Sequence, residues 1–324
     1  MMKRRDFIKA TAIVAPAVGL FPDDLSWISR VSVPGKIEKR SLGKTGEMLS
    51  VIGFGGIVVM NATPEDASKT VKTAIDAGVS YFDVSPSYGD AELKLGLALE
   101  PYRKNVFLSC KTEGLTRVDS RKELEQSLKN LRTDHFDLYQ LHAVTKLADV
   151  KKILGKGGAI ETFLEARKEG KVRFLGFSAH SAEAAMALMQ GFDFDTIMFH
   201  INFKTWYKGN YGPQVLDMAQ EKKMGIIALK SMANGPWPEH ADHKGYEKCW
   251  YEPLKTEEDI KMGLRFTLSH PVTTLIPPGE EKLFMTALKL APDLKPLEKN
   301  EIEAIKAKAQ MGEPLFKYPS AQPV

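Results

Sequence analysis

A regular alternation of strand-like and helix-like segments runs through the chain from Lys39 onward. Short apolar runs recur about every 25–35 residues with helix-period segments between them, which is typical of βαβ units in a parallel sheet. Eight units of this kind predict an α/β protein, a (β/α)8 TIM barrel that binds ligands at the carboxyl ends of its strands. The predicted strands are residues 51–56, 81–85, 106–111, 136–142, 172–178, 196–202, 225–230 and 273–277.

The segments outside these units predict a plugged barrel with long loops at its C-terminal face. Ser41 to Gly46 contains two glycines in a short stretch, which favours an N-terminal hairpin across the closed end of the barrel. The connections 203–213 and 231–256 are long, follow strands and are rich in aromatic residues. Long loops at such places are usually functional. Residues 39–324 are therefore assigned to the barrel and its C-terminal helices.

The first residues have the order of segments that is typical of an export signal. Lys3-Arg4-Arg5-Asp6-Phe7-Ile8-Lys9 precedes a short apolar run and the small residues Ala15-Pro16-Ala17. The basic stretch resembles the twin-arginine type, whose substrates cross the membrane folded. We predict a signal peptide over residues 1–20, a linker over residues 21–38, the twin-arginine translocation machinery as a partner and a periplasmic location. A basic terminus leading into a first helix is the alternative, and the apolar run is too short for stable membrane insertion.

The overall charge gives no support to nucleic acid as a partner. The chain has 45 Lys and Arg against 41 Asp and Glu, a formal charge of +4. Residues 3–9 hold four of the basic side chains and one acidic side chain, so the barrel itself is close to neutral. The two cysteines form no C-x-x-C pair, which argues against an iron–sulfur centre or a structural zinc. No metal site is expected.

Four ionisable side chains lie at the ends of three successive predicted strands, starting in Tyr81-Phe82-Asp83-Val84-Ser85-Pro86-Ser87-Tyr88-Gly89. Asp83 and Tyr88 follow the second strand, Lys111 ends the third and His142 ends the fourth. An ammonium group lowers the pKa of a neighbouring phenol toward the working range. We therefore expect Lys111 to lower the pKa of Tyr88, with Asp83 orienting Lys111. His142 would orient a substrate carbonyl. Taken singly, each residue could equally be part of a strand-end salt bridge or a satisfied polar group.

As an ordered set, Asp83, Tyr88, Lys111 and His142 resemble the catalytic tetrad of the aldo/keto reductases, and the similarity extends over most of the chain. The resemblance implies an NAD(P)-dependent oxidoreductase that reduces a carbonyl or oxidises an alcohol by hydride transfer, with Tyr88 as general acid and base. The expected small-molecule substrate is a carbonyl compound, with a sugar or glycoside as first choice. The alternatives are a non-catalytic periplasmic ligand-binding barrel and a cytoplasmic detoxifying carbonyl reductase.

The resemblance also implies a cofactor site, although several of its markers are changed in this chain. No G-x-G-x-x-G follows the first strand, so a Rossmann site is not indicated. Ala179 and Met198 replace an Asn and a Gln of the family, and Leu229 replaces its stacking tyrosine. The expected cofactor-binding residues are Gly56, Ser178, Asn202, Leu229, Lys230, Pro277, Gly279 and Lys282.

The residues that usually hold a 2′-phosphate are replaced by Glu280-Glu281-Lys282. Two carboxylates would repel a phosphate, while Lys282 and Lys230 would offset them. The family favours NADP, so NADP is the first expectation and NAD the alternative.

Aromatic residues of the two long connections are candidates for stacking on a substrate. We select Trp206 and Tyr207 in the first connection and Trp237 in the second. The alternative is that the second connection folds around a small core of its own.

Overall fold

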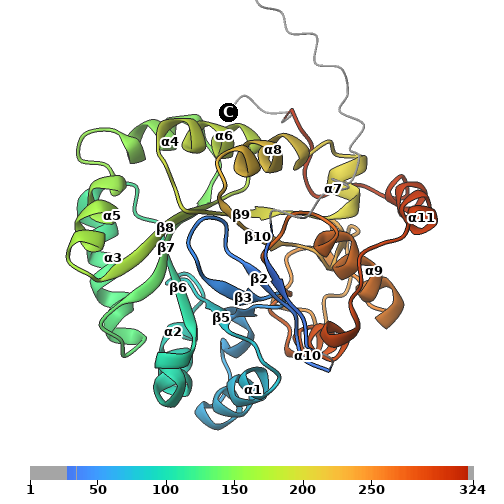
Figure 1. The fold of residues 1–324 in the computed structure, drawn as a ribbon, viewed down its shortest axis with the longest axis horizontal. Helices are drawn as coiled ribbons and strands as arrows, with labels where there is room; N and C mark the ends of the chain where they lie inside the picture. The colour runs from blue at the N-terminus through green and yellow to red at the C-terminus, as the bar shows by residue number, and fades with distance from the viewer. Residues whose placement is uncertain (1–27, 34, 320–324) are drawn as a thin grey trace, which may run out of the picture.

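The computed structural model describes residues 28–33 and 35–319. The predicted signal peptide over residues 1–20 and the first part of the predicted linker lie outside the described residues. Within the rest of that linker, Arg30–Val31 forms a short strand, β1. The helices surround a central set of strands in Figure 1.

Eight parallel strands form the barrel, in agreement with the prediction. Neighbours in sequence are neighbours in the sheet, in the order β13-β10-β9-β8-β7-β6-β5-β4. The first and last strands meet through backbone hydrogen bonds from Gly53 to Leu275 and from Leu275 to Val51, at 2.8 and 2.9 Å. The strands are β4 (Phe54–Gly55), β5 (Tyr81–Asp83), β6 (Phe107–Thr112), β7 (Phe136–Val144), β8 (Val172–Ala179), β9 (Thr196–His200), β10 (Gly225–Leu229) and β13 (Thr274–Ile276).

Four of the helices begin where the sequence supplies a capping hydroxyl. Thr63, Thr116, Ser181 and Thr256 each accept a hydrogen bond from a backbone N–H of the first turn, which satisfies one of the donors left free at a helix start. The helices around the barrel are α1 (Pro64–Asp76), α2 (Ala91–Leu99), α3 (Arg117–Asn130), α4 (Leu147–Leu154), α5 (Ala159–Lys168), α6 (Ala182–Gly191), α8 (Pro213–Glu221), α9 (Glu257–Leu268) and α10 (Glu281–Leu290).

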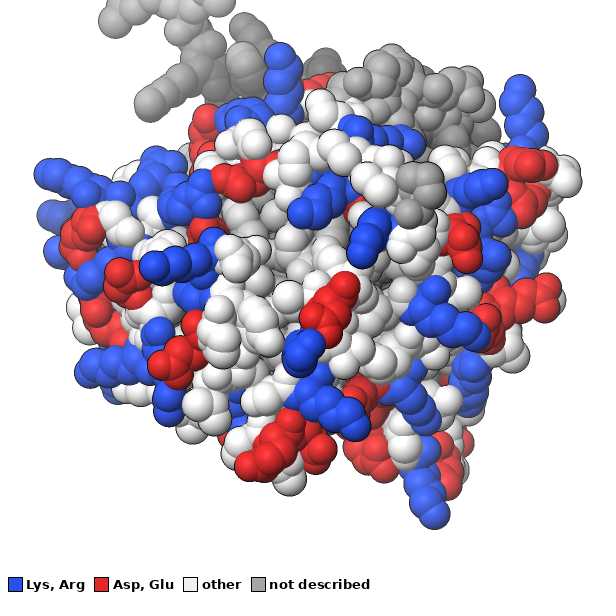
Figure 2. Space-filling view, turned by 60° about the horizontal axis from the view of Figure 1, so that its bottom comes forward, with Lys and Arg blue, Asp and Glu red and all other residues white. Residues whose placement is uncertain are grey.

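Smaller elements complete the chain. They are η1 (Gly56–Val59), η2 (Glu100–Asn105), α7 (Phe203–Tyr207), η3 (Ala291–Asp293) and α11 (Lys299–Ala309). Figure 1 places α11 outside the barrel, as expected for the last helix. None of the helices in the described part of the chain has the length and apolarity needed to cross a membrane. On the face shown in Figure 2, basic and acidic side chains are interspersed.

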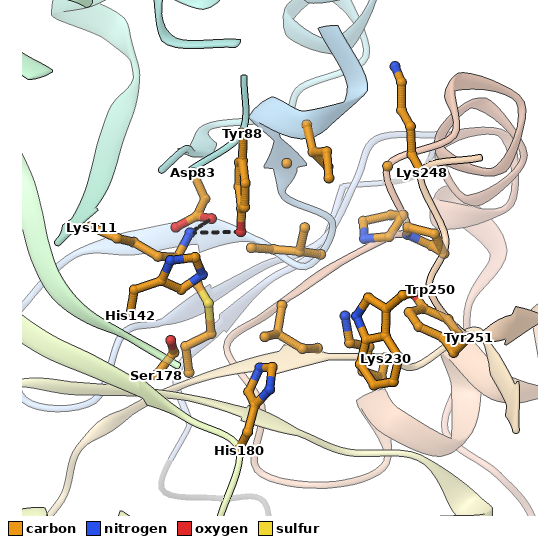
Figure 3. A pocket seen from close by; sticks show the side chains of 18 residues that line it. Asp83, Tyr88, Lys111, His142, Ser178, His180, Lys230, Lys248, Trp250 and Tyr251 are labelled. Atoms are coloured by element: carbon orange, nitrogen blue, oxygen red, sulfur yellow. Dashed lines mark hydrogen bonds and ion pairs between the residues drawn. The ribbon is translucent and has the colours of Figure 1, made fainter. Parts of the chain in front are cut away.

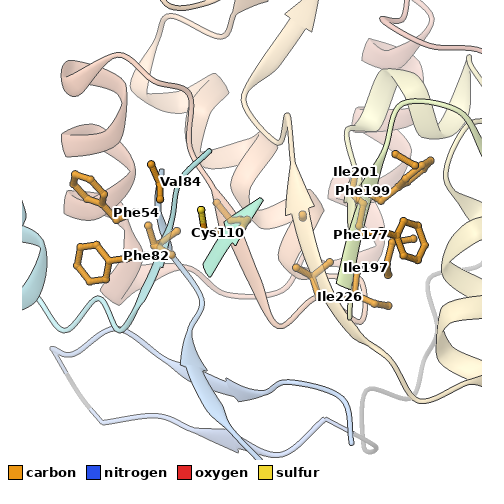
Figure 4. Packing of buried hydrophobic residues seen from close by; sticks show 14 of the residues in the cluster. Phe54, Phe82, Val84, Cys110, Phe177, Ile197, Phe199, Ile201 and Ile226 are labelled. Carbon is orange, nitrogen blue, oxygen red and sulfur yellow. The ribbon is translucent and has the colours of Figure 1, made fainter. Parts of the chain in front are cut away.

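Each strand divides its side chains between two cores with a period of two. Side chains that point outward, such as Phe82, Cys110 and Phe177, pack beneath the helices (Figure 4). Side chains of the other phase, such as Tyr81 and Leu138, fill the barrel interior. The interior-facing positions therefore become the site residues where each strand reaches the mouth.

The closed end of the barrel is plugged by a hairpin, as predicted. Its strands are β2 (Lys39–Ser41) and β3 (Met48–Ser50), and β1 pairs with β2. Leu42 and Leu49 of the hairpin are buried in the barrel interior. Arg40 ties it to the wall, because its guanidinium donates to the Leu268 and Val272 carbonyls at 2.9 and 3.1 Å.

Candidate active site

A cavity of about 180 Å³ lies at the carboxyl ends of the strands (Figure 3). Asp83, Tyr88, Lys111 and His142 all line it, so the structure brings the four predicted catalytic residues together. The alternation of side chains along each strand explains why they meet. Asp83 has the phase of Tyr81, Lys111 that of Phe107 and His142 that of Leu138, and all three apolar residues belong to the interior core.

Lys111 is a buried ammonium group held by Asp83. Its Nζ donates a hydrogen bond to the Asp83 carboxylate, which also accepts from Tyr81 Oη at 3.3 Å and Gln140 Nε2 at 3.2 Å. Burial alone would lower the pKa of Lys111, but the negative charge and hydrogen bond of Asp83, with a further contribution from Tyr88, outweigh it and raise that pKa. Lys111 therefore stays positively charged at neutral pH.

Tyr88 lies on a turn between β5 and α2, within reach of this ammonium group. Lys111 Nζ is 3.5 Å from Tyr88 Oη, and Gly89 has a φ of 55°. Lys111 lowers the pKa of Tyr88, as predicted, but it does not bring that pKa below the ordinary value of a phenol. Burial raises the pKa of Tyr88, and Lys111 only opposes that rise. The phenol is therefore protonated at neutral pH, as a proton donor must be.

His142 presents one nitrogen to its neighbours and leaves the other without a partner. Its Nδ1 lies 3.0 Å from Ser85 Oγ and 3.2 Å from a Glu113 carboxylate oxygen, and Nε2 has no hydrogen bond to a described residue. Burial and then Lys111 lower the pKa of His142 to about 3, so the imidazole is neutral. Ala143, the next residue, has a φ of 53° at an irregularity in the β7–β8 pairing, which sets the direction of the strand end.

Five of the predicted cofactor-binding residues line the cavity. They are Ser178, Leu229, Lys230, Pro277 and Gly279. The Ser178 hydroxyl is already engaged, because it accepts from the Ala143 N–H at 2.7 Å and donates to the Leu141 carbonyl at 3.3 Å.

The other three predicted cofactor residues do not line this cavity. Gly56 packs against Val84, and the neighbouring Gly55 lines the cavity in its place. Asn202 caps α7 and donates to the Ala233 carbonyl at 2.7 Å, so its amide is used within the fold.

Lys282 lies on α10 with its Nζ 3.4 Å from the centre of the Tyr246 ring. For Gly56, Asn202 and Lys282, a position that matches the family's motif therefore did not ensure that the residue reaches the cavity.

The three aromatic residues predicted to contact a substrate lie away from the cavity. Trp206 and Tyr207 belong to α7 and pack against Phe266 of α9. Trp237 stacks on His243 and donates to the Cys249 carbonyl at 2.8 Å. Trp206 is buried, whereas Tyr207 and Trp237 are half-buried, and none of the three lines the cavity.

The 231–256 connection instead supplies Lys248, Trp250 and Tyr251 to the cavity wall (Figure 3). It begins and ends in a small sheet of β11 (Ala233–Gly235) and β12 (Glu252–Pro253). Lys248 Nζ donates to the Val58 carbonyl at 2.8 Å, which fastens the connection across the mouth. The sequence marks this connection as rich in aromatic residues and a candidate for substrate contact, but the alternation of strands does not extend into it and cannot show which ring faces inward.

Lys230 is the unusual cation of the site. Its Nζ lies 5.1 Å from the Trp250 ring centre and 4.7 Å from that of Tyr251, and it has no hydrogen bond or ion pair within the described residues. Burial lowers the pKa of Lys230 to about 8. Its φ of 64° lies in the left-handed region, where a residue with a side chain is strained.

His180 also lines the cavity and was not selected from the sequence. It stands one residue beyond β8, on the same phase as Phe174 and Ser178. Counting every second residue past the strand end would have found it.

Sequence comparison agrees with this geometry. The model of the aldo/keto reductase family matches residues 51–258. L-galactose dehydrogenase of Arabidopsis thaliana is 32% identical over 218 residues, which cover 62% of this chain and 67% of that protein. The 6-dehydroglucose reductase of Novosphingobium aromaticivorans is 34% identical over 172 residues, which cover 46% of this chain and 54% of that protein. The chain thus spans between about half and two thirds of the length of these curated relatives.

Solved structures show the same fold. An aldo-keto reductase from Bacillus halodurans, in its holo form, superposes with a TM-score of 0.67 at 20% identity and covers 86% of this chain and 98% of that chain. A protein described as a putative aldo-keto reductase from Pseudomonas superposes with a TM-score of 0.62 at 21% identity, covering 79% of this chain and 95% of that chain.

Proposed function

This chain belongs to the aldo/keto reductase family, an oxidoreductase family, and we propose that it interconverts a carbonyl and an alcohol with Tyr88 as general acid and base. The observation that carries the proposal is the buried Lys111 ammonium, which lies between the Asp83 carboxylate and the Tyr88 phenol at the cavity wall. A buried charge is costly, and a barrel that needed only a packed interior could fill this place with apolar side chains.

Each of these residues has a role in moving one proton. In reduction, Tyr88 Oη donates its proton to the oxygen of the substrate. Lys111 stabilises the phenolate that is left, because an adjacent positive charge favours the ionised form. His142 Nε2 contacts the same oxygen and orients it, and Asp83 holds Lys111 in place. The roles reverse in oxidation.

The cavity residues fit a nicotinamide dinucleotide. Lys230 is a half-buried cation without a carboxylate partner in the described residues, and a diphosphate would provide the missing anion. Gly55 and Gly279 line the cavity with backbone alone, because a Cβ at either position would clash with Ile276 or Ile57. When bound, the nicotinamide supplies or accepts the hydride. The cavity itself suits the reacting fragment, because ligand sites for larger molecules measure roughly 300–1,000 Å³.

NAD is better supported than NADP by the residues that follow Gly279. Glu280 accepts a hydrogen bond from the Lys248 backbone N–H at 2.5 Å, and Glu281 accepts one from the Thr70 hydroxyl at 2.7 Å. Both carboxylates are thereby fixed at the start of α10, where they would repel a 2′-phosphate. Calorimetric titration should give a lower Kd for NAD than for NADP. In Glu280→Gln the two Kd values should lie closer together, because one of the repelling carboxylates is removed.

A sugar or sugar-derived carbonyl is the substrate class that the relatives support. Two of them are named for galactose and for 6-dehydroglucose. The polar groups of the cavity, His142, His180 and Lys230, agree with a ligand that carries several hydroxyl groups.

We further propose that the protein is exported to the periplasm through the twin-arginine route, carrying its dinucleotide. The support is Arg4-Arg5 and the apolar run behind it. Since Lys248 fastens the 231–256 connection across the mouth, slow release of the dinucleotide is expected. Native mass spectrometry of protein from the exported fraction should show a mature chain that starts after the signal and carries a bound dinucleotide. Intact Met1 in that fraction would contradict export by this signal.

The reaction itself is tested with NADH that is deuterated at C4. Incubation with a panel of sugar-derived aldehydes and ketones should place deuterium on the carbinol carbon of one product, detected by mass spectrometry. A protein that binds the carbonyl compounds but transfers no deuterium, from NADH or from NADPH, would support the non-catalytic binding barrel instead.

A further inference from the structure

We infer that His180 selects the substrate by hydrogen-bonding a hydroxyl group on the carbon next to the reacting carbon. The substrate class would then be α-hydroxy carbonyl compounds and the corresponding vicinal diols. This inference rests on the proposed function, because it takes Tyr88 and His142 as the residues that hold the reacting oxygen.

His180 is fixed at the cavity wall on the side away from Tyr88 (Figure 3). Its backbone N–H donates to the Val144 carbonyl at 3.0 Å, which attaches the end of β8 to the end of β7. Its phase is that of Ser178, so the strand directs its side chain toward the mouth of the barrel. Tyr88 and His180 therefore line the same small cavity from two sides.

The His180 ring has no hydrogen bond or ion pair within the described residues; its contacts there are with aromatic rings. Burial, followed by the charge of Lys230, lowers the pKa of His180 to about 4, so the imidazole is neutral. The His180 ring is half-buried at the cavity wall. A neutral imidazole carries one donor and one acceptor, and a substrate that displaces water from the cavity makes an unmatched nitrogen costly. A substrate hydroxyl can satisfy either nitrogen.

A neighbouring imidazole, that of the buried His200, packs behind His180. The His200 ring lies 4.5 Å from the His180 ring and stacks on Phe316, also at 4.5 Å between centres. His200 is fully buried, and neither of its ring nitrogens has a hydrogen-bond partner in the structure. Since this packed ring lies behind it, His180 cannot turn away from the cavity without disturbing the aromatic cluster.

Lys230 is the other polar group near this wall, and the proposed dinucleotide would occupy its ammonium group. Met198, Leu229 and Ile276 are apolar, and the Ser178 hydroxyl is engaged with β7. In a cavity of about 180 Å³ a second substrate oxygen must lie close to the first. A substrate without that hydroxyl would leave His180 unpaired, which is the situation in which a site discriminates strongly.

The test compares two aldehydes that differ in their hydroxyl groups, glyceraldehyde and propanal, in the full-length enzyme with saturating dinucleotide. In His180→Phe, kcat/KM for glyceraldehyde should fall roughly tenfold, mainly through KM, while the value for propanal stays within about twofold. His180→Asn, which keeps a donor and an acceptor, should recover most of the loss. Tyr211→Phe is the control, because Tyr211 stacks on Phe199 and Phe316 in the same aromatic cluster, and it should leave the preference unchanged.

Equal losses for both aldehydes, or no loss for glyceraldehyde, would overturn the assignment of His180. Failure of the proposed function would look different, because the wild-type protein would then reduce neither aldehyde and Tyr88→Phe would change nothing. In that event, NMR titration with 1,2-propanediol and 1-propanol decides the matter without turnover. Preferential binding of the diol that is lost in His180→Phe supports the assignment, and equal binding of both alcohols overturns it.

Discussion

The two ends of the barrel hold a cation in opposite ways, Arg40 buried at the closed end and Lys230 half-buried at the open end. At the closed end, Arg40 is 2% exposed, and its guanidinium is satisfied by Glu38 at 2.6 Å and by two backbone carbonyls. At the open end, Lys230 lies against two aromatic rings and has no anion or acceptor in the described part of the chain. The cation of the closed end therefore belongs to the fold, whereas that of the open end is available to a ligand.

The largest expected effect is at the open end and concerns chemistry alone. Tyr88→Phe should lower kcat/KM by roughly 10²–10⁴-fold, because the proton donor is lost. Its unfolding free energy should stay close to that of the wild type, since among the described residues the Tyr88 hydroxyl accepts a hydrogen bond only from Lys111, at 3.5 Å. Steady-state kinetics and urea denaturation measure the two quantities. Tyr102→Phe is the control, because Tyr102 packs outside the barrel; full turnover in a folded Tyr88→Phe protein would refute the role of Tyr88.

The next effect is at the closed end and concerns stability alone. Arg40→Met leaves the Glu38 carboxylate and the carbonyls of Leu268 and Val272 without their donor. The unfolding free energy should drop by about 3–5 kcal/mol, as when one partner of a buried ion pair is removed. Urea denaturation gives the value, with Arg30→Met in the exposed strand β1 as a control. A loss below that of the control would show that the hairpin is not anchored through Arg40.

Removing the open-end cation, Lys230, should change the unfolding free energy in the opposite direction from removing Arg40. Lys230→Met should raise the unfolding free energy at pH 7 by about 1–2 kcal/mol, because a half-buried unpaired charge is relieved. The Kd for NAD should rise about tenfold, since a charge-assisted contact is lost. Calorimetry and urea denaturation test both. Lys255→Met, which removes a cation from another aromatic ring, is the control; a destabilised Lys230→Met protein with unchanged Kd would contradict the comparison.

The pH dependence of stability sharpens the same contrast. The pKa of Lys230 is about 8 in the folded protein against 10.5 for an ordinary lysine. Between these values the unfolded chain binds more protons than the folded one, so stability should rise with pH in this window. The Lys230→Met protein should lack that increment. If the wild type and the variant gave parallel stability curves from pH 8 to pH 10.5, the depressed pKa would be refuted.

The smallest expected effect is the absence of a histidine step in the activity profile. The pKa values of His142 and His180 are lowered to about 3 and about 4, so neither ring changes charge between pH 5 and pH 8. A plot of kcat/KM over this range should show no transition that disappears in His142→Asn. A transition near pH 6.5 that is lost in that variant would show that His142 titrates as an ordinary histidine.

The sequence by itself determined the eight strands, the hairpin and the four residues at the strand ends. These features follow from local rules, because a strand alternates its side chains with a period of two and parallel strands end at one face. The same rule, carried one step past β8, would also have found His180. Asp83, Lys111 and His142 could be placed because each belongs to a strand.

Only the tertiary structure decided which loop residues reach the cavity and how the site residues ionise. Trp250 and Tyr251 face the mouth while Trp237 does not, because the path of the 231–256 connection depends on contacts such as that between Lys248 and Val58. The pKa of Tyr88 is raised because burial outweighs Lys111. The burial of a side chain and its distance from other groups depend on residues far apart in the chain. A local pattern of residues therefore cannot predict them.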